Sequence, residues 1–461
     1  MRRFDVVVLG AGSGNMVIGD EFSGRDVAIV EERAFGGTCL NFGCIPSKML
    51  VYPAQVVDSL AAAPALGVRA HGRGLDWEQV STRVFDHTDK VAAAGRRDRI
   101  ESDFVTVYEG HARFRGPRTI EISRADGRIE EITAEQIVIA VGGRPAVPAP
   151  VREAGVAYET SDTIMRIGRA PRHLAILGGG YVAAELAQVF AAAGSRITLI
   201  EQQHTLLGAA QDDDIRATYT ALATERYALR LGAEVVEAAG RDGQLRLDLD
   251  SGDPVEADIL LVAAGRTPNT DRLAVAAAGV EIDEHGGVIV DRFGRTSAEG
   301  IYALGDACDT VPLKHVANRE ARVVAHNLLH PDDPVSVDDV PVPSAVFTTP
   351  QIAAVGRTEN QCRAAGLDYR VGVAHYRRIA YGWACRDDTG FCKVLTDADG
   401  QIVGAHILGP QAATLIQIFV VAMSFGIRAQ QLAQRPLWVH PAPSEIVERA
   451  LLDLHHPDRT C

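Results

Sequence analysis

The sequence lacks an excess of positive charge. Its 60 acidic residues outnumber its 46 Lys and Arg residues, which gives a formal net charge of −14 at pH 7. This balance argues against nucleic acid and anionic membrane surfaces as partners, because both attract basic patches. The simplest consequence of the charge is solubility. Lysine is especially rare and occurs only at positions 48, 90, 314 and 393.

Long apolar runs are also missing. A membrane-spanning helix needs about 20 consecutive apolar residues, and the best candidate, residues 174–194, is interrupted by Glu185. The apolar run after Phe4 lasts only a few residues before Gly10, which is too short for the hydrophobic region of a secretory signal. The seven cysteines are odd in number and mostly scattered, which favours a reducing compartment. We therefore expect a cytoplasmic protein without a membrane partner.

Two of the cysteines, Cys39 and Cys44, lie five positions apart with Gly43 between them. A disulfide needs Cα atoms within roughly 4.4–6.8 Å, whereas five extended residues span about 17 Å, so the chain must turn tightly here. Pro46 suits the first turn of a following helix. Cys44 would then lie near the N-terminus of that helix, where the dipole favours a thiolate. The pattern predicts a reversible redox disulfide; the alternatives are a structural disulfide and half of a zinc site.

Two segments have the pattern of a dinucleotide-binding fold. Residues 5–9 form an apolar strand that runs into the glycine turn 10–15 and an expected helix, and a second strand, 27–30, ends at Glu31. The pattern recurs about 170 residues later with the turn 178–183, a helix at 184–193 and a strand that ends at Glu201. In such folds the turn holds a pyrophosphate and the acidic residue binds a ribose hydroxyl. Two fingerprints predict two dinucleotides.

The remaining chain divides at proline-rich and glycine-rich stretches. At 461 residues it is too long for one domain. We expect an α/β protein with a first nucleotide domain at 1–147, a second at 148–267, a segment at 268–338 that returns to the first domain, and a C-terminal α+β domain at 339–461. In the last domain, residues 412–425 predict a helix that is apolar on most sides and therefore buried.

The string GGTCLNFGCIPSK (residues 36–48) resembles the redox motif of the two-cysteine flavoprotein disulfide reductases, which include glutathione reductase, lipoamide dehydrogenase and mycothione reductase. The resemblance extends over nearly the whole chain. It implies two Rossmann-like domains, for FAD and for NAD(P), and a C-terminal dimerisation domain. It also implies a homodimer that reduces a small disulfide with electrons from NAD(P)H.

The resemblance also implies site residues. For FAD these are Gly10, Gly12, Gly14, Asn15, Glu31, Gly37, Thr38, Lys48, Gly142 and Asp306. For NAD(P) they are Gly178, Gly180, Tyr181, Ala183, Glu185, Glu201 and Gly265, with Tyr181 covering the nicotinamide pocket. Asn15 departs from the third glycine of the usual fingerprint. No metal site is expected.

Catalytic roles follow from the same resemblance. Cys44 would face the flavin as a thiolate, and Cys39 would be the exposed thiol that attacks the substrate. Imidazole suits the proton carrier that this exchange needs, and a carboxylate behind it fixes the tautomer. The segment 438–445 matches the family's H-P-x-x-x-E with His440 and Glu445, and His440 would complete the partner's site. Lys48 and Glu185 resemble the ion pair near the flavin.

Four shorter runs resemble the mycothione reductases; they are residues 12–15, 313–318, 380–383 and 423–426. Ser47 is more like lipoamide dehydrogenase. Mycothiol disulfide is therefore the expected substrate, the alternatives being a dihydrolipoamide dehydrogenase subunit and a flavoprotein that reduces metal ions or quinones. Glu201 predicts a preference for NADH, because a carboxylate binds the ribose 2′-hydroxyl and repels a 2′-phosphate. Cys461 is expected to lie on an inert tail.

Overall fold

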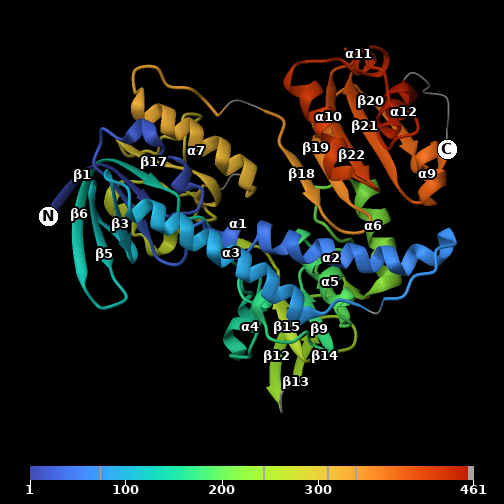
Figure 1. Ribbon diagram of the computed structural model, residues 1–461, viewed down its shortest axis with the longest axis horizontal. Helices are drawn as coiled ribbons and strands as arrows, with labels where there is room; N and C mark the ends of the chain where they lie inside the picture. The colour runs from blue at the N-terminus through green and yellow to red at the C-terminus, as the bar shows by residue number, and fades with distance from the viewer. Residues whose placement is uncertain (73, 242–243, 309–310, 338–339, 455–461) are drawn as a thin grey trace.

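The computed structural model describes residues 1–72, 74–241, 244–308, 311–337 and 340–454. Figure 1 shows an N-terminal sheet at the left, a second nucleotide-type sheet at the lower right and a C-terminal region at the upper right. Two long helices, α2 (Cys44–Ala62) and α3 (Trp77–Ile100), lie across the middle. Cys461 falls outside the described residues, so its expected role stays a prediction.

The N-terminal sheet has seven strands with a parallel centre. They are β1 (Arg2–Leu9), β2 (Val27–Glu31), β3 (Val105–Glu109), β4 (His111–Gly116), β5 (Thr119–Ser123), β6 (Ile129–Ile139) and β17 (Ile301–Ala303). Their order is β3-β2-β1-β6-β5-β4, and β17 pairs in parallel with the end of β6. The apolar end of β1 is buried on both faces, as expected for a central parallel strand. The late strand β17 brings the chain back to this sheet, and α7 (Lys314–Leu329) follows it.

The segment after the first glycine turn differs from the prediction. Instead of a regular helix, the structure has only the short 3-10 turns η1 (Gly14–Met16) and η2 (Asp20–Phe22). Gly19 is extended between them and interrupts helical geometry. The guanidinium of Arg99 donates to the backbone carbonyls of Asn15 at 2.7 Å and Ile18 at 2.6 Å. These carbonyls would otherwise accept the hydrogen bonds of a helix, so α3 holds the segment in its irregular form.

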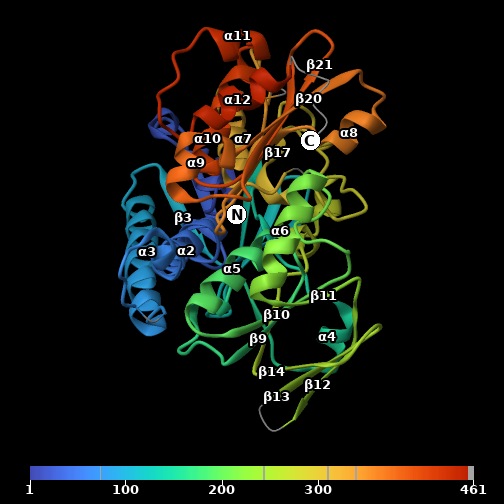
Figure 2. The same ribbon diagram turned by 90° about the vertical axis from the view of Figure 1, so that its right-hand side faces the viewer.

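The second nucleotide fold agrees closely with the predicted strands. Its parallel sheet has the order β11-β10-β9-β15-β8. These strands are β8 (Glu159–Thr160), β9 (His173–Leu177), β10 (Arg196–Glu201), β11 (Ala228–Leu231) and β15 (Ile259–Val262). The predicted helix is α5 (Tyr181–Ala192), and α6 (Asp213–Arg226) follows β10. A separate antiparallel sheet, β12 (Val235–Arg241), β13 (Gln244–Leu249) and β14 (Val255–Ala257), lies at the lower end in Figure 2.

The two crossings between the nucleotide folds lie side by side. β7 (Gly143–Pro145) pairs antiparallel with β16 (Arg266–Pro268), so the chain leaves and re-enters the first fold through one two-stranded connection. The shorter elements around these folds are α1 (Gly37–Asn41), η3 (Ala63–Leu66), α4 (Ala149–Ala154), η4 (Ile164–Arg166), η5 (Asn269–Arg272), η6 (Val275–Ala278) and η7 (Gly305–Ala307).

The C-terminal region is an antiparallel sheet covered by helices. The sheet order is β18-β19-β22-β21-β20, with β18 (Pro343–Val346), β19 (Ile352–Gly356), β20 (Tyr369–His375), β21 (Phe391–Asp397) and β22 (Ile402–Leu408). Its helical elements are α8 (Glu359–Ala364), η8 (Tyr376–Arg378), α9 (Ala380–Cys385), α10 (Ala412–Ser424), α11 (Ala429–Gln434) and α12 (Glu445–Asp453). The predicted apolar helix α10 buries Ile416 and Phe419, but Val421 is 50% exposed. In a single chain this helix is therefore buried on one side only.

A buried ion cluster joins the second nucleotide fold to the C-terminal sheet. Lys393 on β21 is 2% exposed, and its Nζ lies 2.9 Å from Asp212, 2.6 Å from Asp214 and 2.6 Å from Glu359. Asp212 also caps α6 through the backbone amide of Asp214. These neighbouring carboxylates raise the pKa of Lys393 above its usual range despite burial, which lowers it. The lysine is therefore held charged between the two regions.

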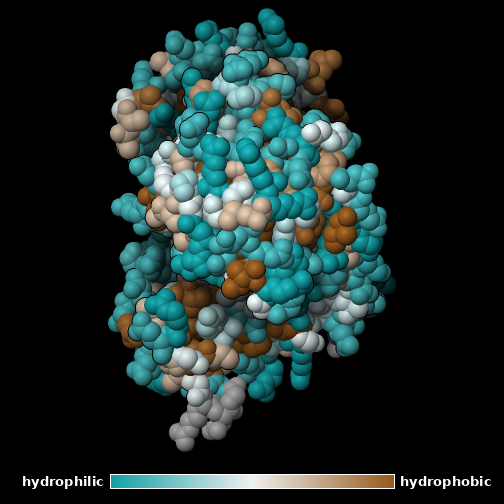
Figure 3. Space-filling model, turned by 90° about the vertical axis from the view of Figure 1, so that its left-hand side faces the viewer, coloured by the Kyte–Doolittle hydropathy of each residue, from teal (hydrophilic) through white to brown (hydrophobic). Residues whose placement is uncertain are grey.

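One helical segment within the described residues, 37–66, is long and apolar enough, by length and composition alone, to cross a membrane. Two charged residues inside it pair with other elements: Lys48 with Glu185, and Asp58 with Arg226. Charged side chains are costly in lipid, so we interpret the segment as a helix that packs within the protein. The face of the molecule in Figure 3 is mostly hydrophilic with scattered apolar patches.

Candidate active site

The predicted turn brings Cys39 and Cys44 together. Cys39 lies in α1, and Cys44 is the first residue of α2, as predicted from Pro46. The side-chain amide of Asn41 donates to the carbonyl oxygens of Phe35 and Gly37, both at 2.9 Å, and so closes the turn from inside. Both cysteines are free thiols in this structure.

The two thiols have opposite electrostatics. The pKa of Cys44 falls to about 6, chiefly because the Cys39 thiol donates a hydrogen bond to its thiolate, with Lys48 assisting against the cost of burial. The pKa of Cys39 rises, first through the same hydrogen bond and then through burial. Cys44 is therefore the thiolate of the pair. It is also the more exposed, whereas Cys39 is half-buried. Cys39 was predicted to be the exposed thiol, and this is wrong for the single chain. Cys44 is the more exposed because the start of α2 lies open to the cavity described below.

A pH dependence follows from this thiolate. Because the pKa of Cys44 is lowered to about 6, its reactive thiolate predominates above that pH and is lost as the pH falls below it. We expect the alkylation rate of Cys44 by iodoacetamide in the reduced protein to be half-maximal near pH 6, whereas an ordinary thiol has its midpoint near pH 8.5. Cys385, whose pKa is raised by burial, is an internal control in the same mass-spectrometric experiment. A Cys44 midpoint at or above pH 8 would contradict the assignment.

Lys48 and Glu185 form the predicted ion pair. Lys48 lies one helical turn after Cys44 on α2, and its Nζ is 2.6 Å from Oε2 of Glu185 on α5. The other carboxylate oxygen accepts the backbone N–H of Phe347 at 3.0 Å. The Lys48 ammonium also lies 4.9 Å from the centre of the Phe347 ring. The pair therefore joins the redox turn to the second nucleotide fold and to the start of the C-terminal region.

A cavity of about 750 Å³ connects the redox turn to the first glycine turn. Its described lining includes many of the residues predicted for FAD and catalysis and one, Tyr181, predicted for the nicotinamide: Gly10, Gly12, Glu31, Gly37, Thr38, Cys39, Cys44, Lys48, Gly142, Tyr181, Glu185 and Asp306. Gly14 and Asn15 are outside the lining. Gly14 packs instead against Val8 and Ala140, and the Asn15 side chain accepts a hydrogen bond from Arg99 at 2.7 Å. Both residues therefore contact the protein interior next to the turn and not the cavity.

The two glycine turns are built alike. Gly10 and Gly178 have φ angles of 105° and 111°, and a side chain at either would collide with a carbonyl of the adjoining strand end. Glu31 accepts the backbone N–H of Ala11 at 2.6 Å, and Glu201 accepts that of Gly179 at 2.6 Å. A carboxylate has further acceptor positions beyond these bonds. Each turn is therefore shaped for close approach of a ligand backbone, with an acceptor beside it.

The remaining residues predicted for NAD(P) surround the second turn. Gly180 caps α5, Ala183 is buried inside that helix, and Gly265 precedes β16 with its carbonyl accepting Ala146 N–H at 2.9 Å. The Tyr181 hydroxyl accepts a hydrogen bond at 2.5 Å from the side-chain amide of Gln211, a contact that the sequence did not indicate.

Arg216, the next basic residue after the strand that ends at Glu201, contacts Gln203 near that strand end. The guanidinium of Arg216 on α6 donates to the side chain of Gln203 at 2.9 Å and pairs with Asp213 at 3.1 Å. The prediction of a preference for NADH noted that residues 201–208 contain no arginine or lysine and that the next basic residue, Arg216, follows the acidic run 212–214. The fold brings Arg216 back to this strand end through the first turn of α6. Its proximity to residue 203 could be found only from the packing of α6.

His440 and Glu445 also form the predicted pair. Nδ1 of His440 lies 2.8 Å from Oε1 of Glu445, which begins α12 and is 7% exposed as a residue. The imidazole side chain itself is 69% exposed, so Nε2 is free to act on a group outside this region. Neither residue is among the described lining of the cavity. The single chain therefore leaves the cysteines and the histidine apart.

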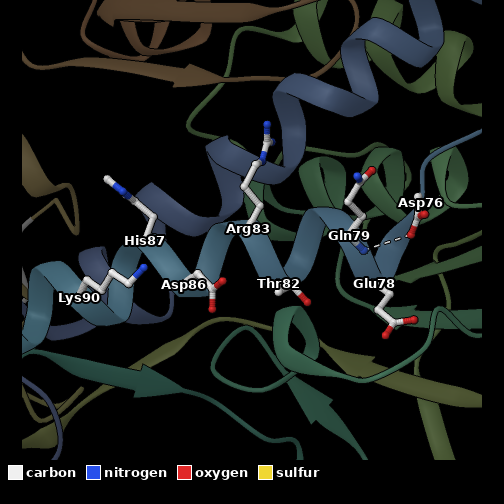
Figure 4. A pocket seen from close by; sticks show the side chains of 8 residues that line it. All are labelled: Asp76, Glu78, Gln79, Thr82, Arg83, Asp86, His87 and Lys90. Atoms are coloured by element: carbon white, nitrogen blue, oxygen red, sulfur yellow. Dashed lines mark hydrogen bonds between the residues drawn. The ribbon is translucent and has the colours of Figure 1, made fainter.

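Lys314 is a cavity residue to which the sequence assigned no role. The Nζ of Lys314, at the start of α7, donates to the Ser13 hydroxyl at 2.8 Å in the same cavity. A second hollow lies along the outer face of α3 and is lined by polar side chains that include Arg83, His87 and Lys90 (Figure 4). It holds neither a cysteine nor a glycine turn, so we do not assign it a function.

Comparison with known proteins gives two family matches that together cover most of the chain. The pyridine nucleotide-disulphide oxidoreductase family matches residues 4–321, and its dimerisation domain matches residues 342–451. Mycothione reductase from Mycobacterium tuberculosis is 45% identical over 98% of this chain and 100% of its own length. Glutathione reductase from Burkholderia cepacia is 32% identical over 96% of this chain and 97% of its own length.

Solved structures of similar proteins have the same fold. The Cu(II) complex of the HOCl-induced flavoprotein disulfide reductase RclA from Escherichia coli has a TM-score of 0.86 and 27% identity, and the match covers 98% of this chain and 99% of that one. LpdA from Mycobacterium tuberculosis has a TM-score of 0.86 and 25% identity, with coverage of 98% and 100%.

Proposed function

Because this chain belongs to the pyridine nucleotide-disulphide oxidoreductases, we propose that it reduces mycothiol disulfide through Cys39 and Cys44. The family uses FAD and NAD(P)H and carries a dimerisation domain that supports a homodimer. The observation that carries the proposal is a cavity in which a coupled pair of thiols, one of them a thiolate near neutral pH, lies beside the Lys48–Glu185 ion pair. The similarity to mycothione reductase suggests the substrate.

The residues of the cavity fit FAD. Glu31 and the Ala11 amide stand at the glycine turn, and the lining continues from there to Cys44 and Lys48. When bound there, FAD would supply the two-electron chemistry that links the nicotinamide to the Cys39–Cys44 disulfide. Lys48 supplies positive charge beside Cys44, and Glu185 holds Lys48 in place. For NAD(P), the second glycine turn, Glu201 and Tyr181 would hold the ligand at the start of α5.

The exchange step uses the protein's own groups. His440 takes the proton of the Cys39 thiol, and the Cys39 thiolate attacks one sulfur of the substrate disulfide. The S–S bond breaks, and the leaving thiolate takes that proton back from the His440 imidazolium. The Cys44 thiolate then attacks Cys39 Sγ in the mixed disulfide, which re-forms the Cys39–Cys44 disulfide and releases the second product as a thiolate that takes its proton from solvent. One substrate disulfide is thereby reduced to two thiols with the two electrons of the Cys39–Cys44 pair, which is oxidised to its disulfide.

The test compares three disulfides. NAD(P)H oxidation by the purified protein should be fastest with mycothiol disulfide and at least tenfold slower, in kcat/KM, with lipoamide and glutathione disulfide. A preference for lipoamide would instead support a dihydrolipoamide dehydrogenase subunit, which the similarity to dihydrolipoyl dehydrogenases at about 31% identity keeps as the second candidate. Turnover with quinones or metal ions but with no disulfide would overturn both.

We further propose a cytoplasmic homodimer in which His440 serves the partner's cavity. All described cysteines are free thiols, which suits a reducing compartment. The side chains that flank the histidine support a second copy as the missing cover: Leu437 is 100% exposed, Val439 71% and Phe425, just after α10, 79%. Large apolar side chains exposed on a C-terminal region that matches the dimerisation family favour an interface.

NADH is the proposed nicotinamide donor. The Glu201 carboxylate is fixed at the glycine turn by the Gly179 and Gln203 amides at 2.6 and 2.8 Å, so it does not point to solvent. A 2′-phosphate there would lose the carboxylate–hydroxyl bond and meet like charge. This costs about 1.5–3 kcal/mol, or ~10- to 150-fold in kcat/KM. Arg216 opposes part of this effect, but its charge is already paired with Asp213.

Kinetic constants for NADH and NADPH test this preference. Glu201→Ala with Gln202→Arg should shift the ratio of kcat/KM values toward NADPH. Arg216→Met is the matched control. If the Arg216 guanidinium assists a 2′-phosphate, this change lowers kcat/KM for NADPH and leaves kcat/KM for NADH unchanged. A wild-type ratio favouring NADPH by about tenfold at neutral pH would refute the preference.

A further inference from the structure

Lys314 places an ammonium group in the wall of the redox cavity. It is the first residue of α7, half-buried, and its Nζ donates to the Ser13 hydroxyl at 2.8 Å and lies 3.8 Å from the Met16 sulfur. Burial lowers the pKa of Lys314, while Cys39 and Cys44 raise it. The mechanism above gives this lysine no task.

Within the part of the chain that the structure describes, Lys314 has no acidic partner, unlike the other basic side chains of the cavity. Every other basic residue in the described lining lies within ion-pair distance of a carboxylate; the pairs are Arg33–Asp162, Lys48–Glu185, His111–Glu32, Arg144–Asp271, Arg266–Asp306 and Arg272–Glu32. The described partners of Lys314 are a hydroxyl and a thioether. A half-buried cation without a counter-ion is costly, so this lysine is suited to an anion that forms during function.

The nearest source of such an anion is the redox turn. Ser13 belongs to the glycine turn, and the neighbouring Gly12 touches Gly37: a side-chain carbon on Gly37 would lie only 2.6 Å from the Gly12 Cα. Cys39 follows Gly37 by two residues. Lys314 is thus bonded to a turn that packs against the turn carrying Cys39, and both residues line the same cavity. The charged and titratable groups that act on Cys39 are Cys44, Lys314 and Lys48, and both lysines lower its pKa.

We propose that Lys314 is a positioning residue that stabilises the Cys39 thiolate during disulfide exchange, an inference that rests on the proposed function. The two lysines then act on different cysteines. Lys48 is neutralised by Glu185 and acts beside Cys44, whereas Lys314 keeps its charge for Cys39. Cys39 has to be a thiolate at the moment when it attacks the substrate disulfide. The later attack of Cys44 on Cys39 Sγ expels the substrate thiolate and leaves no charge on Cys39. When Cys39 ionises, the ammonium is already in place and none of the described ion pairs has to break.

The test isolates Cys39 by using the Cys44→Ser background, which removes the coupled thiol. The alkylation rate of Cys39 by iodoacetamide is measured against pH by mass spectrometry, with Lys314 retained or changed to Met, Gln or Arg. An adjacent unit charge shifts a thiol pKa by about one unit or more, so Lys314→Met and Lys314→Gln should each slow alkylation at neutral pH about tenfold. Lys314→Arg should restore most of the rate. Lys90→Met, on the exposed face of α3, should change nothing.

Two results would overturn the proposal. One is an unchanged Cys39 pH profile in both Lys314→Met and Lys314→Gln. The Gln variant keeps a hydrogen-bond donor for Ser13, so its profile decides the question if the Met variant misfolds. The other is a raised KM for the disulfide in Lys314→Gln with an unchanged profile, which would make the lysine a substrate-binding residue. Because alkylation needs no disulfide substrate, the result is independent of the three-disulfide comparison. Failure of that comparison alone would refute mycothiol disulfide as the substrate and would not affect the proposed role of Lys314.

Discussion

Replacing Cys39 by serine should abolish disulfide turnover while leaving the reduced enzyme coloured. Only the Cys44 thiolate is expected to stack on the flavin, so the long-wavelength charge-transfer band of the two-electron-reduced enzyme should persist in Cys39→Ser and disappear in Cys44→Ser. The structure supports this division, because the pKa of Cys44 is lowered to about 6 while that of Cys39 is raised. Loss of a covalent nucleophile reduces turnover by on the order of 10⁶-fold in a well-studied hydrolase, and a loss to background is expected here.

The measurement combines absorption spectra under anaerobic reduction with turnover of mycothiol disulfide. Cys385→Ser is a matched control, because Cys385 is a half-buried thiol on α9 of the C-terminal region and should leave both readouts unchanged. Identical spectra for Cys39→Ser and Cys44→Ser would show that the two roles are wrongly assigned.

Mixing two inactive variants should restore activity if each site is built from two chains. His440→Ala should lose about 10²- to 10⁴-fold in rate as the proton carrier is removed, and Cys39→Ser loses the attacking thiol. In a two-fold dimer, random exchange makes half of the dimers mixed, and each mixed dimer has one intact site. About a quarter of all sites, and of wild-type activity, should therefore return.

This expectation rests on the separation of the two groups within one chain. The His440 imidazole is 69% exposed and lies outside the described lining of the cavity that contains Cys39. A mixture of Cys39→Ser with Cys39→Ala chains is the control and should stay inactive. Exchange is verified by mass spectrometry of differently tagged chains. A fully active monomer in sedimentation experiments, or exchanged chains without activity, would refute a shared site.

The strands and the redox turn could be predicted because their signals are local. β9 and β10 follow from short apolar runs that end in a glycine or an acidic residue, and Cys44 at the start of α2 follows from Pro46 two residues later. The helix after the first glycine turn could not be excluded in this way. It is prevented by Arg99, whose hydrogen bonds to the carbonyls of Asn15 and Ile18 come from another helix.

The site residues show the same difference between local signals and contacts that depend on packing. Lys48, Glu185, His440 and Glu445 were found because they stand at fixed places in recognisable motifs. Lys314 reaches Ser13 across 301 positions of sequence. Arg216 reaches Gln203 only because α6 folds back onto β10. Such contacts depend on packing between elements, and no spacing in the chain indicates them.

The scarcity of lysine gives the protein an unusual reactivity toward amine-directed reagents. Lys393 is 2% exposed among three carboxylates, Lys48 is paired with Glu185, and Lys314 is half-buried in the cavity. Lys90 remains, on the polar outer face of α3 (Figure 4). An activated ester at low excess should therefore attach a dye or a resin to that one helix, besides the terminal amine. The enzyme could then be tethered in a single orientation with its cavity open.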